Sequence, residues 1–366
     1  MAVSVDRPTT ARVLSVAIRA DASVAIGSGH VMRCAALATA LRSRGAAVVF
    51  VCRSAPGDLL AWLDSAGFAV RALAPAVTGW EEDDAAATRA ALAGIDPDWL
   101  IVDHYQLDAR WEQSMRPAAG RILAIDDLAD RPHECDVLLD QNLYLDSAAR
   151  YAGRVPAACT RLLGPGYALL RPQFRRARAL VKKRPSEVGR ILLAFGGSDA
   201  GNETAKALRA IRLLDRSAMQ VDVVVGAANP HRAALEQYCR TLHNVVLHCQ
   251  VDDMARLMLG ADLCVGAGGS TSWERCCVGL PTLAVAIAAN QVEAARTLGK
   301  LGYVRFLGSA DQISEQDIAQ ALVRAIADGA ALQAMAQHGM KLVDGEGASR
   351  VAAFLAALCM QEQLNE

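Results

Sequence analysis

The sequence lacks the features that would point to a nucleic acid, a membrane or an acidic tail. Its 38 Lys and Arg residues are balanced by 39 Asp and Glu residues, so neither a basic binding face nor a solvating acidic segment is indicated. The longest apolar runs, such as residues 283–289, have the length of a strand, far below the ~20 residues of a membrane span. We therefore expect neither a nucleic-acid partner nor a membrane partner.

The sequence also lacks a disulfide pattern and an internal repeat of 20–50 residues, and we expect no leader. None of its ten cysteines forms a Cys-x-x-Cys motif, and the only close pair is Cys276-Cys277. Free thiols in a reducing compartment fit this spacing better than a disulfide framework. Asp6 and Arg7 come before any long apolar core, which argues against a signal peptide. We expect a cytoplasmic protein.

What is present is enough apolar sequence for about two or three domains. The chain has 366 residues, of which 53% are hydrophobic and 21% charged. Short β-branched runs alternate with Ala- and Leu-rich helical segments, a pattern typical of α/β folds with parallel sheets covered on both faces. The expected strands are 13–18, 48–52, 100–103, 122–126 and 137–140, then 191–195, 221–225, 245–248, 263–266 and 282–287.

A basic helical segment divides the chain into two α/β halves. Residues 171–184 read RPQFRRARALVKKR, and we interpret them as an inter-domain helix that ends near Pro185, with a solvated surface helix as the simpler interpretation. We expect an N-terminal domain over 1–170, the linker helix over 171–185, a C-terminal domain over 186–346 and a final helix over 347–366.

The first glycine-rich loop, residues 27–29, follows the first expected strand and precedes a helix expected over 31–44. Such a loop presents unpaired N–H groups and the positive end of a helix dipole, which favour an anion or a polar oxygen. His30 stands at the start of the helix. The dipole disfavours a cationic ring, so we expect a neutral imidazole that can accept a proton. The alternative is a histidine that only caps a turn.

Two further glycine loops follow strands of the second half. One is Phe195–Asp199 (FGGSD) and the other is Gly266–Thr271 (GAGGST), with Glu274 one turn into the next helix. Together they predict a diphosphate cradle of backbone N–H groups. Glu274 could accept from sugar hydroxyls or could cap helix N–H groups. Asn290-Gln291, after the last expected strand, could bind hydroxyl or phosphate oxygens, although Asn290 could equally be an N-cap.

Polar residues also end successive strands of the first half, at Asp103-His104-Tyr105, at Asp126-Asp127 and at Asp140. Because ligands of open α/β sheets bind beyond the carboxyl ends of the strands, we expect these side chains to line one wall of a cleft. His104 and His133 have no recognisable ligand spacing, so we assign no metal. Residues 96–98 (DPD) precede their strand, and we interpret them as a loop.

Several of these motifs together resemble one enzyme family. They are IRADASVAIGSGHVMRC (18–34), DHY (103–105), IDDLADRPHECDVLLDQN (125–142), LLGPGYALLRPQF (162–174), FGGSD (195–199) and GAGGSTSWE (266–274). The family is the UDP-2,4-diacetamido-2,4,6-trideoxy-β-L-altropyranose hydrolases of pseudaminic acid biosynthesis, a pathway of flagellin glycosylation. The resemblance extends from about residue 18 to about residue 303. The C-terminal motifs are shared with the wider GT-B glycosyltransferase superfamily.

The resemblance implies two Rossmann-like domains that face a cleft, and removal of UDP from the anomeric carbon by water with inversion. It implies no cofactor, no metal and a small-molecule UDP-sugar as the partner, and we expect a monomer. It places catalysis at His30 and Tyr105. The expected substrate-binding residues are Arg19, Asp21, Gly27, Gly29, Asp103, Gly197, Ser198, Gly269, Ser270, Thr271, Glu274, Asn290 and Gln291.

Spacing leaves open whether Asp21 or Asp103 orients His30. It also leaves three alternatives to hydrolysis. A GT-B glycosyltransferase would use a sugar hydroxyl in place of water, a binding module would hold UDP without turnover, and a UDP-sugar epimerase would rest on architecture alone.

Overall fold

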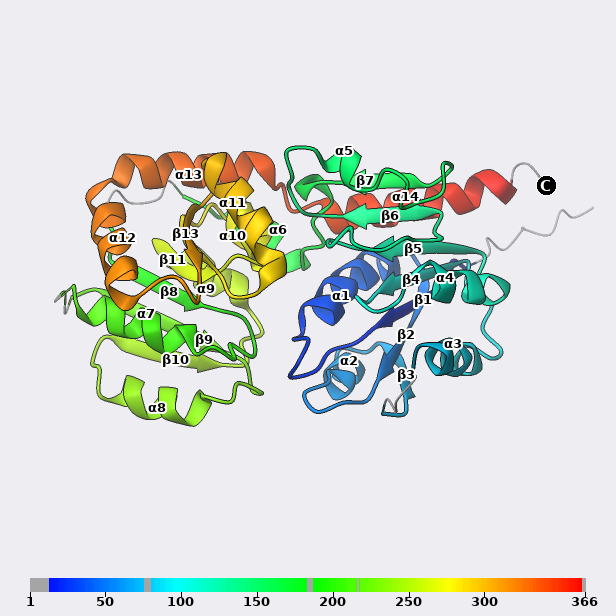
Figure 1. The fold of residues 1–366 in the computed structure, drawn as a ribbon, viewed down its shortest axis with the longest axis horizontal. Helices are drawn as coiled ribbons and strands as arrows, with labels where there is room; N and C mark the ends of the chain where they lie inside the picture. Colours follow the sequence, from blue (N-terminus) through cyan, green and yellow to red (C-terminus); the bar gives the residue numbers. More distant parts are fainter. Residues whose placement is uncertain (1–12, 76–79, 183–186, 215, 217, 364–366) are drawn as a thin grey trace, which may run out of the picture.

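The computed structural model describes residues 13–75, 80–182, 187–214, 216 and 218–363, which form two parallel sheets flanked by helices. The expected end of the linker at Pro185 and the segment around Asp6 lie outside the described residues. Figure 1 shows the N-terminal half on the right and the C-terminal half on the left. This is the two-domain α/β architecture that the alternating pattern predicts; the exact domain boundaries stay a prediction.

The N-terminal sheet has seven strands in the order β3-β2-β1-β4-β5-β6-β7. The strands are β1 (Ser15–Ala20), β2 (Ala47–Arg53), β3 (Ala69–Leu73), β4 (Trp99–Asp103), β5 (Arg121–Ile125), β6 (Val137–Asp140) and β7 (Thr160–Leu163). The helices are α1 (Gly29–Arg42), α2 (Leu60–Ser65), α3 (Trp80–Ala91), α4 (Ala109–Met115) and α5 (Ser147–Arg150), with 3₁₀ turns at Arg116–Ala118 and Pro165–Tyr167.

The C-terminal sheet has six strands in the order β10-β9-β8-β11-β12-β13. The strands are β8 (Arg190–Ala194), β9 (Gln220–Val225), β10 (Val245–Cys249), β11 (Leu263–Ala267), β12 (Thr282–Ala286) and β13 (Arg305–Ser309). The helices are α6 (Pro172–Ala179), α7 (Glu203–Arg212), α8 (Arg232–Arg240), α9 (Met254–Gly260), α10 (Thr271–Cys277), α11 (Val292–Lys300), α12 (Glu315–Ala327) and α13 (Gly329–Leu342), with a 3₁₀ turn at Ala289–Gln291. The last helix, α14 (Gly347–Gln363), follows α13.

Both faces of each sheet are buried, because alternate residues of a strand point to opposite sides. On β8, Ile191 and Leu193 belong to one apolar cluster, whereas Leu192 and Ala194 belong to another. The interdomain helix α6 buries Phe174 in the second of these clusters, so it packs on the C-terminal half.

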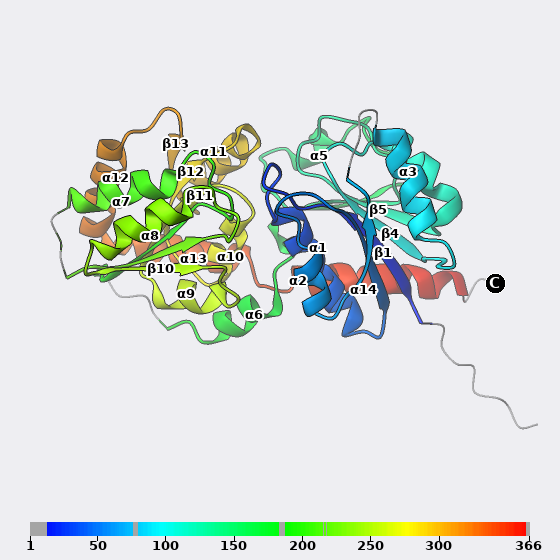
Figure 2. The same ribbon diagram turned by 90° about the horizontal axis from the view of Figure 1, so that it is seen from below.

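Helix α14 returns to the N-terminal half, as both views show. In Figure 2 it lies beside α1, and its residues Val351 and Leu355 join the core that β1 and α1 form. The indole of Trp99 on β4 donates a hydrogen bond to the Leu355 carbonyl at 3.3 Å. The sequence predicts this helix but not its place in the N-terminal core.

The sequence analysis missed three strands, β3, β7 and β13. Each is an edge strand whose residues are mostly exposed or only partly buried, so the apolar run that marks a buried strand is short or absent. The ten cysteines are free thiols, and seven of them are buried. Across the described ranges, no helix is both long and apolar enough to cross a membrane.

Strand order reverses once in each sheet, between β1 and β4 and between β8 and β11. At such a switch point the connections leave in opposite directions, and a crevice opens beyond the carboxyl ends of the two central strands. The loops that follow β1, β8 and β11 are the three glycine loops of the sequence, and β4 ends at Asp103. The fold therefore puts these motifs at the two positions where an open α/β sheet binds ligands.

Candidate active site

His30 and Asp103 form a hydrogen-bonded pair at the switch point of the N-terminal sheet. His30 is the second residue of α1 and is buried, and its Nδ1 lies 2.6 Å from Oδ1 of Asp103 at the end of β4. Because a carboxylate only accepts, Nδ1 carries the proton, and in the neutral ring Nε2 then holds the free lone pair. Of the two carboxylates that the sequence offered as orienting partners of His30, the structure selects Asp103.

Arg33, one turn further along α1, clamps the carboxylate of this pair. Its Nε and Nη2 donate to the two Asp103 oxygens at 2.6 and 2.7 Å, and its Nη1 donates to Asp127 Oδ2 at 2.9 Å. Burial alone would raise the pKa of Asp103, but Arg33 and His30 hold that pKa well below its usual range. Asp103 is thus a fixed anion with one oxygen directed at the imidazole.

Tyr105 packs against His30 and reaches the other half of the molecule. The two rings meet edge to face, with centroids 4.5 Å apart. The Tyr105 hydroxyl accepts a hydrogen bond from Nδ2 of Asn290 at 3.2 Å. Burial raises the pKa of Tyr105 well above its ordinary value, and the negative charge of Asp127 adds to that effect, so the phenol stays protonated.

The three glycine loops meet at the junction of the halves. A Cβ placed on Gly29 would lie 3.9 Å from the Ser270 hydroxyl, and one on Gly197 would lie 3.6 Å from the Ser28 hydroxyl. Gly29, Gly197 and Ser270 are all exposed, so solvent reaches this surface. His30 and the two loops proposed to hold a diphosphate therefore lie next to one another in space, although more than 160 residues separate them in the sequence.

The remaining C-terminal residues border the same loops. Gln291 accepts from the Ile287 N–H at 3.1 Å, and its Nε2 lies 3.2 Å from where a Cβ on Gly269 would be. Asn290 precedes Gln291, the N-cap residue of α11, so the N-cap interpretation of Asn290 is wrong and its amide contacts Tyr105 instead. Ser198 is the fourth residue of the FGGSD loop, and Thr271 is the first residue of α10.

Glu274 lies in the first turn of α10, where its Oε1 is 3.6 Å from Nη2 of Arg171. Burial raises the pKa of Glu274, while the charge of Arg171 opposes that shift. The N-cap residue of α10 is Ser270, and its side chain makes no capping bond.

Arg19 and Asp21, which the resemblance places at the substrate, form a buried ion-pair network. Arg19 is fully buried, and its guanidinium donates to Asp21 and Asp84. Asp21 also accepts from the Arg53 N–H at 2.6 Å. These contacts anchor the end of β1 and leave Arg19 no exposed donor, so the predicted contact of Arg19 with substrate has no support in this geometry. Gly27, with a φ of +76°, closes the short loop that follows Asp21.

Sequence reasoning placed Asp127 on the wall of the cleft but missed Arg33, which binds its carboxylate. Asp127 Oδ1 is buried and accepts no hydrogen bond, although Oδ2 is held by Arg33. Arg33 lies three residues after His30, the spacing that puts two side chains on one helix face, and this was the available signal. Sequence reasoning also missed a second contact between the halves. In this contact, Arg150 Nη1 donates to Glu293 of α11 at 3.0 Å.

Comparisons with solved structures support this architecture. MurG from Acinetobacter baumannii superposes with a TM-score of 0.63 at 15% identity, over 94% of this chain and 99% of that one. The UDP-GlcNAc 2-epimerase from Neisseria meningitidis, solved with UDP-GlcNAc bound, gives a TM-score of 0.64 at 11% identity, over 94% and 100% of the two chains. The chain has the GT-B fold.

Sequence comparisons confirm the resemblance that the motifs indicated. Residues 191–348 match the glycosyltransferase family 28 C-terminal domain. The chain is 26% identical to the UDP-2,4-diacetamido-2,4,6-trideoxy-β-L-altropyranose hydrolase of Campylobacter jejuni, over 79% of this chain and 98% of that protein. It is 31% identical to the spore coat polysaccharide biosynthesis protein SpsG of Bacillus subtilis over 54% of this chain, and spans only 59% of that relative's length. It likewise spans 55% of an uncharacterised relative from Methanocaldococcus jannaschii.

Proposed function

We propose that this protein is a UDP-sugar hydrolase. It releases UDP from UDP-2,4-diacetamido-2,4,6-trideoxy-β-L-altropyranose by attack of water at the anomeric carbon, with inversion and without a metal or cofactor. The free sugar then serves pseudaminic acid biosynthesis and flagellin glycosylation in the cytoplasm, and the enzyme acts as a monomer. The sugar is that of the Campylobacter relative, which this chain matches over nearly all of that protein's length.

The observation that carries the proposal is the His30–Asp103 pair beside the exposed glycine loops. With Nδ1–H donated to Asp103, Nε2 of His30 is a base of the right kind for a water proton. In the reaction, the water oxygen bonds to C1 from the face opposite UDP. The C1–O bond breaks, the electron pair leaves with UDP, and the water proton passes to Nε2. General-base help of this kind typically contributes about 10²–10⁴ in rate.

UDP is already a good leaving group, so its departure needs stabilisation of charge more than protonation. In the loops 196–199 and 268–271, backbone N–H groups are fixed dipoles that would face the diphosphate without reorganising during the reaction, apart from that of Gly268, which donates to the Val285 carbonyl at 2.8 Å. Asn290 and Gln291 add amide donors, and Glu274 can accept from ribose hydroxyls. Asp103 stays ionised throughout and stabilises the imidazolium that forms on His30.

Tyr105 completes the sugar side of the site. Its hydroxyl remains protonated, touches His30 through the ring, and is bonded to Asn290 of the other half. It can therefore position the water or a sugar substituent while linking the half that carries the base to the half that carries the loops.

A glycosyltransferase is the second candidate, and the match of residues 191–348 to a glycosyltransferase domain favours it. The same base would then deprotonate a sugar hydroxyl in place of water. The two functions differ in what they require, because a hydrolase turns over in buffer alone and a transferase needs an acceptor.

The experiment is NMR of the sugar released from the UDP-sugar in ¹⁸O water. We expect turnover without acceptor, ¹⁸O at C1 and inverted configuration. His30→Ala should lower kcat by about 10²–10⁴ with UDP affinity nearly unchanged. The exposed His243 provides the matched control, since His243→Ala should keep full activity. Dependence on an acceptor would favour the transferase, and an active His30→Ala enzyme would remove His30 from the chemistry.

A further inference from the structure

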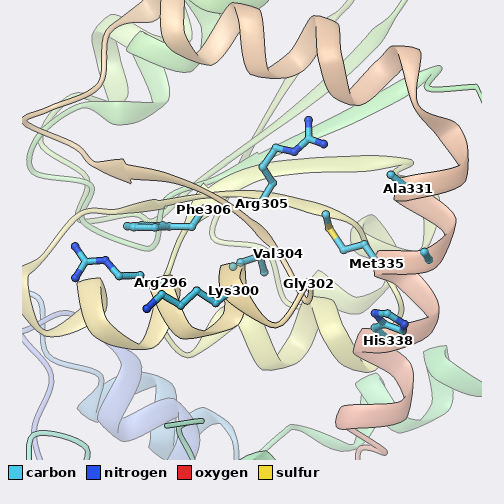
Figure 3. Close-up of a pocket in the computed structure, with 11 residues that line it drawn as sticks. Arg296, Lys300, Gly302, Val304, Arg305, Phe306, Ala331, Met335 and His338 are labelled. Carbon is cyan, nitrogen blue, oxygen red and sulfur yellow. The ribbon is translucent and has the colours of Figure 1, made fainter. Parts of the chain in front are cut away.

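A hollow of about 630 Å³ lies in the C-terminal half, away from the glycine loops. Figure 3 shows its walls: Arg296 and Lys300 rise from α11, Arg305 and Phe306 come from β13, and Met335 and His338 come from α13. Arg305 is the first residue of β13, so the hollow opens at the amino-terminal edge of the parallel sheet. The glycine loops occupy the opposite, carboxyl-terminal edge. The hollow is therefore separate from the candidate active site.

Its charges are all of one sign. The lining side chains include three permanent cations, Arg296, Lys300 and Arg305, and no carboxylate. Within the part of the chain that the structure describes, these three side chains make no ion pair and no side-chain hydrogen bond. Arg296 and Lys300 are exposed and Arg305 is partly buried, unlike the buried Arg19 and Arg33, which are paired with carboxylates. An adjoining pocket that Arg305 also lines contains two carboxylates, and both accept from helix-capping N–H groups: Asp328 from the Ala331 N–H and Asp317 from the Ser314 N–H.

The floor between these cations is apolar. Phe306, Val304 and Met335 form it, and Phe306 is held in place because Gly299 of α11 leaves room for it: a Cβ there would come within 2.9 Å of the Phe306 Cβ. The volume falls within the range of about 300–1,000 Å³ that is typical of small-molecule sites. A flat apolar group can rest on the ring of Phe306 while its anionic end faces guanidinium groups, which match phosphate and carboxylate oxygens in pairs.

We propose that this hollow binds a small organic anion, in which a phosphate or carboxylate group is attached to a flat apolar body. The inference does not rest on the proposed hydrolase function, since no residue of the glycine loops takes part. Arg296, Lys300 and Arg305 supply the charge that selects an anion, and Phe306 supplies the surface that distinguishes an aromatic anion from inorganic phosphate.

The test is calorimetric titration of the full-length protein with phenyl phosphate, benzoate and inorganic phosphate, with and without saturating UDP. We expect saturable binding of phenyl phosphate or benzoate that UDP does not displace. Arg296→Ala and Lys300→Ala should each weaken it about tenfold, the loss expected for one charge-assisted contact. Both side chains are exposed, so the variants should fold. Lys341→Ala, an exposed cation of α13 outside the hollow, is the matched control and should bind normally.

Phe306→Leu should weaken binding of phenyl phosphate more than binding of inorganic phosphate. Absence of saturable binding, displacement by UDP, or equal affinity in Arg296→Ala and the wild type would overturn the proposal. Loss of sugar turnover or of UDP binding would bear only on the proposed function, so the two can fail independently.

Discussion

His133 should make the stability of the folded protein fall as the pH rises from about 6.5 to about 9. The ring is buried, its Nδ1 lies 2.8 Å from Glu112 Oε1, and its Nε2 lies 3.8 Å from Asp126 Oδ2. Burial alone would lower the pKa of His133, but the two carboxylates outweigh it and raise the pKa to about 9. The folded protein therefore holds this proton at pH values where the unfolded chain has released it.

The sign and size of the pH effect on the free energy of unfolding follow from this difference in pKa between the folded and unfolded states. Below pH 6.5 both states are protonated and the stabilisation is fully present, whereas above about 9 both are neutral and it is lost. The interval from 6.5 to about 9, at ~1.4 kcal/mol for each pH unit, corresponds to about 3.5 kcal/mol of unfolding free energy. His104 and Asp140 titrate elsewhere: burial lowers the pKa of His104 to about 4 and raises that of Asp140 to about 7. The contribution of His104 is complete by about pH 6.5, but that of Asp140 extends past pH 7, and burial also raises the pKa of thiols such as Cys276. The part of the slope that belongs to His133 is therefore the difference between the wild type and His133→Gln.

The assay is urea unfolding at pH 7, 8 and 9 for the wild type and for His133→Gln. We expect the free energy of unfolding of the wild type to fall through this interval and that of His133→Gln to fall markedly less, whatever its absolute value, because the other titrating groups are the same in both proteins. Carbon-13 NMR of the His133 imidazole in the wild type measures its pKa directly, without a variant. Equal slopes for the two proteins, or an imidazole that titrates near 6.5, would refute the reasoning.

Three other changes should have separable effects. Asp103→Asn should lower kcat by about a hundredfold while UDP affinity holds in equilibrium titration, because the charge that stabilises the imidazolium is lost; unchanged kcat would leave Asp103 without a part in the reaction. Glu274→Ala should weaken UDP binding about tenfold and change kcat less, and equal UDP affinity would remove Glu274 from the nucleotide site. Gly347→Ala should cost about 1–3 kcal/mol in chemical denaturation, since its Cβ would overlap the Ala168 carbonyl, whereas Gly260→Ala, which meets nothing within 4 Å, should not destabilise.

The sequence predicts the buried strands well, and with them the places where loops can act. Strands such as β6 and β12 are continuous apolar runs because helices cover both faces, and the glycine residues that follow β1, β8 and β11 mark their carboxyl ends. A run of apolar residues does not show whether its strand lies at the edge of the sheet. For this reason β13, with every side chain only partly buried, escaped prediction although it forms a wall of the hollow.

The position of helix α14 is a second feature of the fold that the sequence pattern does not predict. Its apolar spacing predicts a helix that must bury one face, but Val351 and Leu355 could pack on either half equally well by pattern alone. The deciding contacts are specific and distant: Trp99 bonds to the Leu355 carbonyl, and Gly347 lies against the Ala168 backbone. Neither contact leaves a periodic signal in the sequence.

The choice of partner for His30 depends on strand order, which residue spacing does not encode. Asp21 lies nine residues from His30 and Asp103 lies 73 residues away, so distance along the chain favours the wrong carboxylate. Because β4 pairs directly with β1, Asp103 emerges beside the start of α1, where Arg33 fixes both of its oxygens. Asp21 is meanwhile occupied by Arg19 and the Arg53 N–H. A strand order in which another strand stood next to β1 would leave the same histidine at the same glycine loop without a buried anion beside it. The imidazole would then lack the partner that fixes its tautomer and leaves Nε2 free to accept a proton.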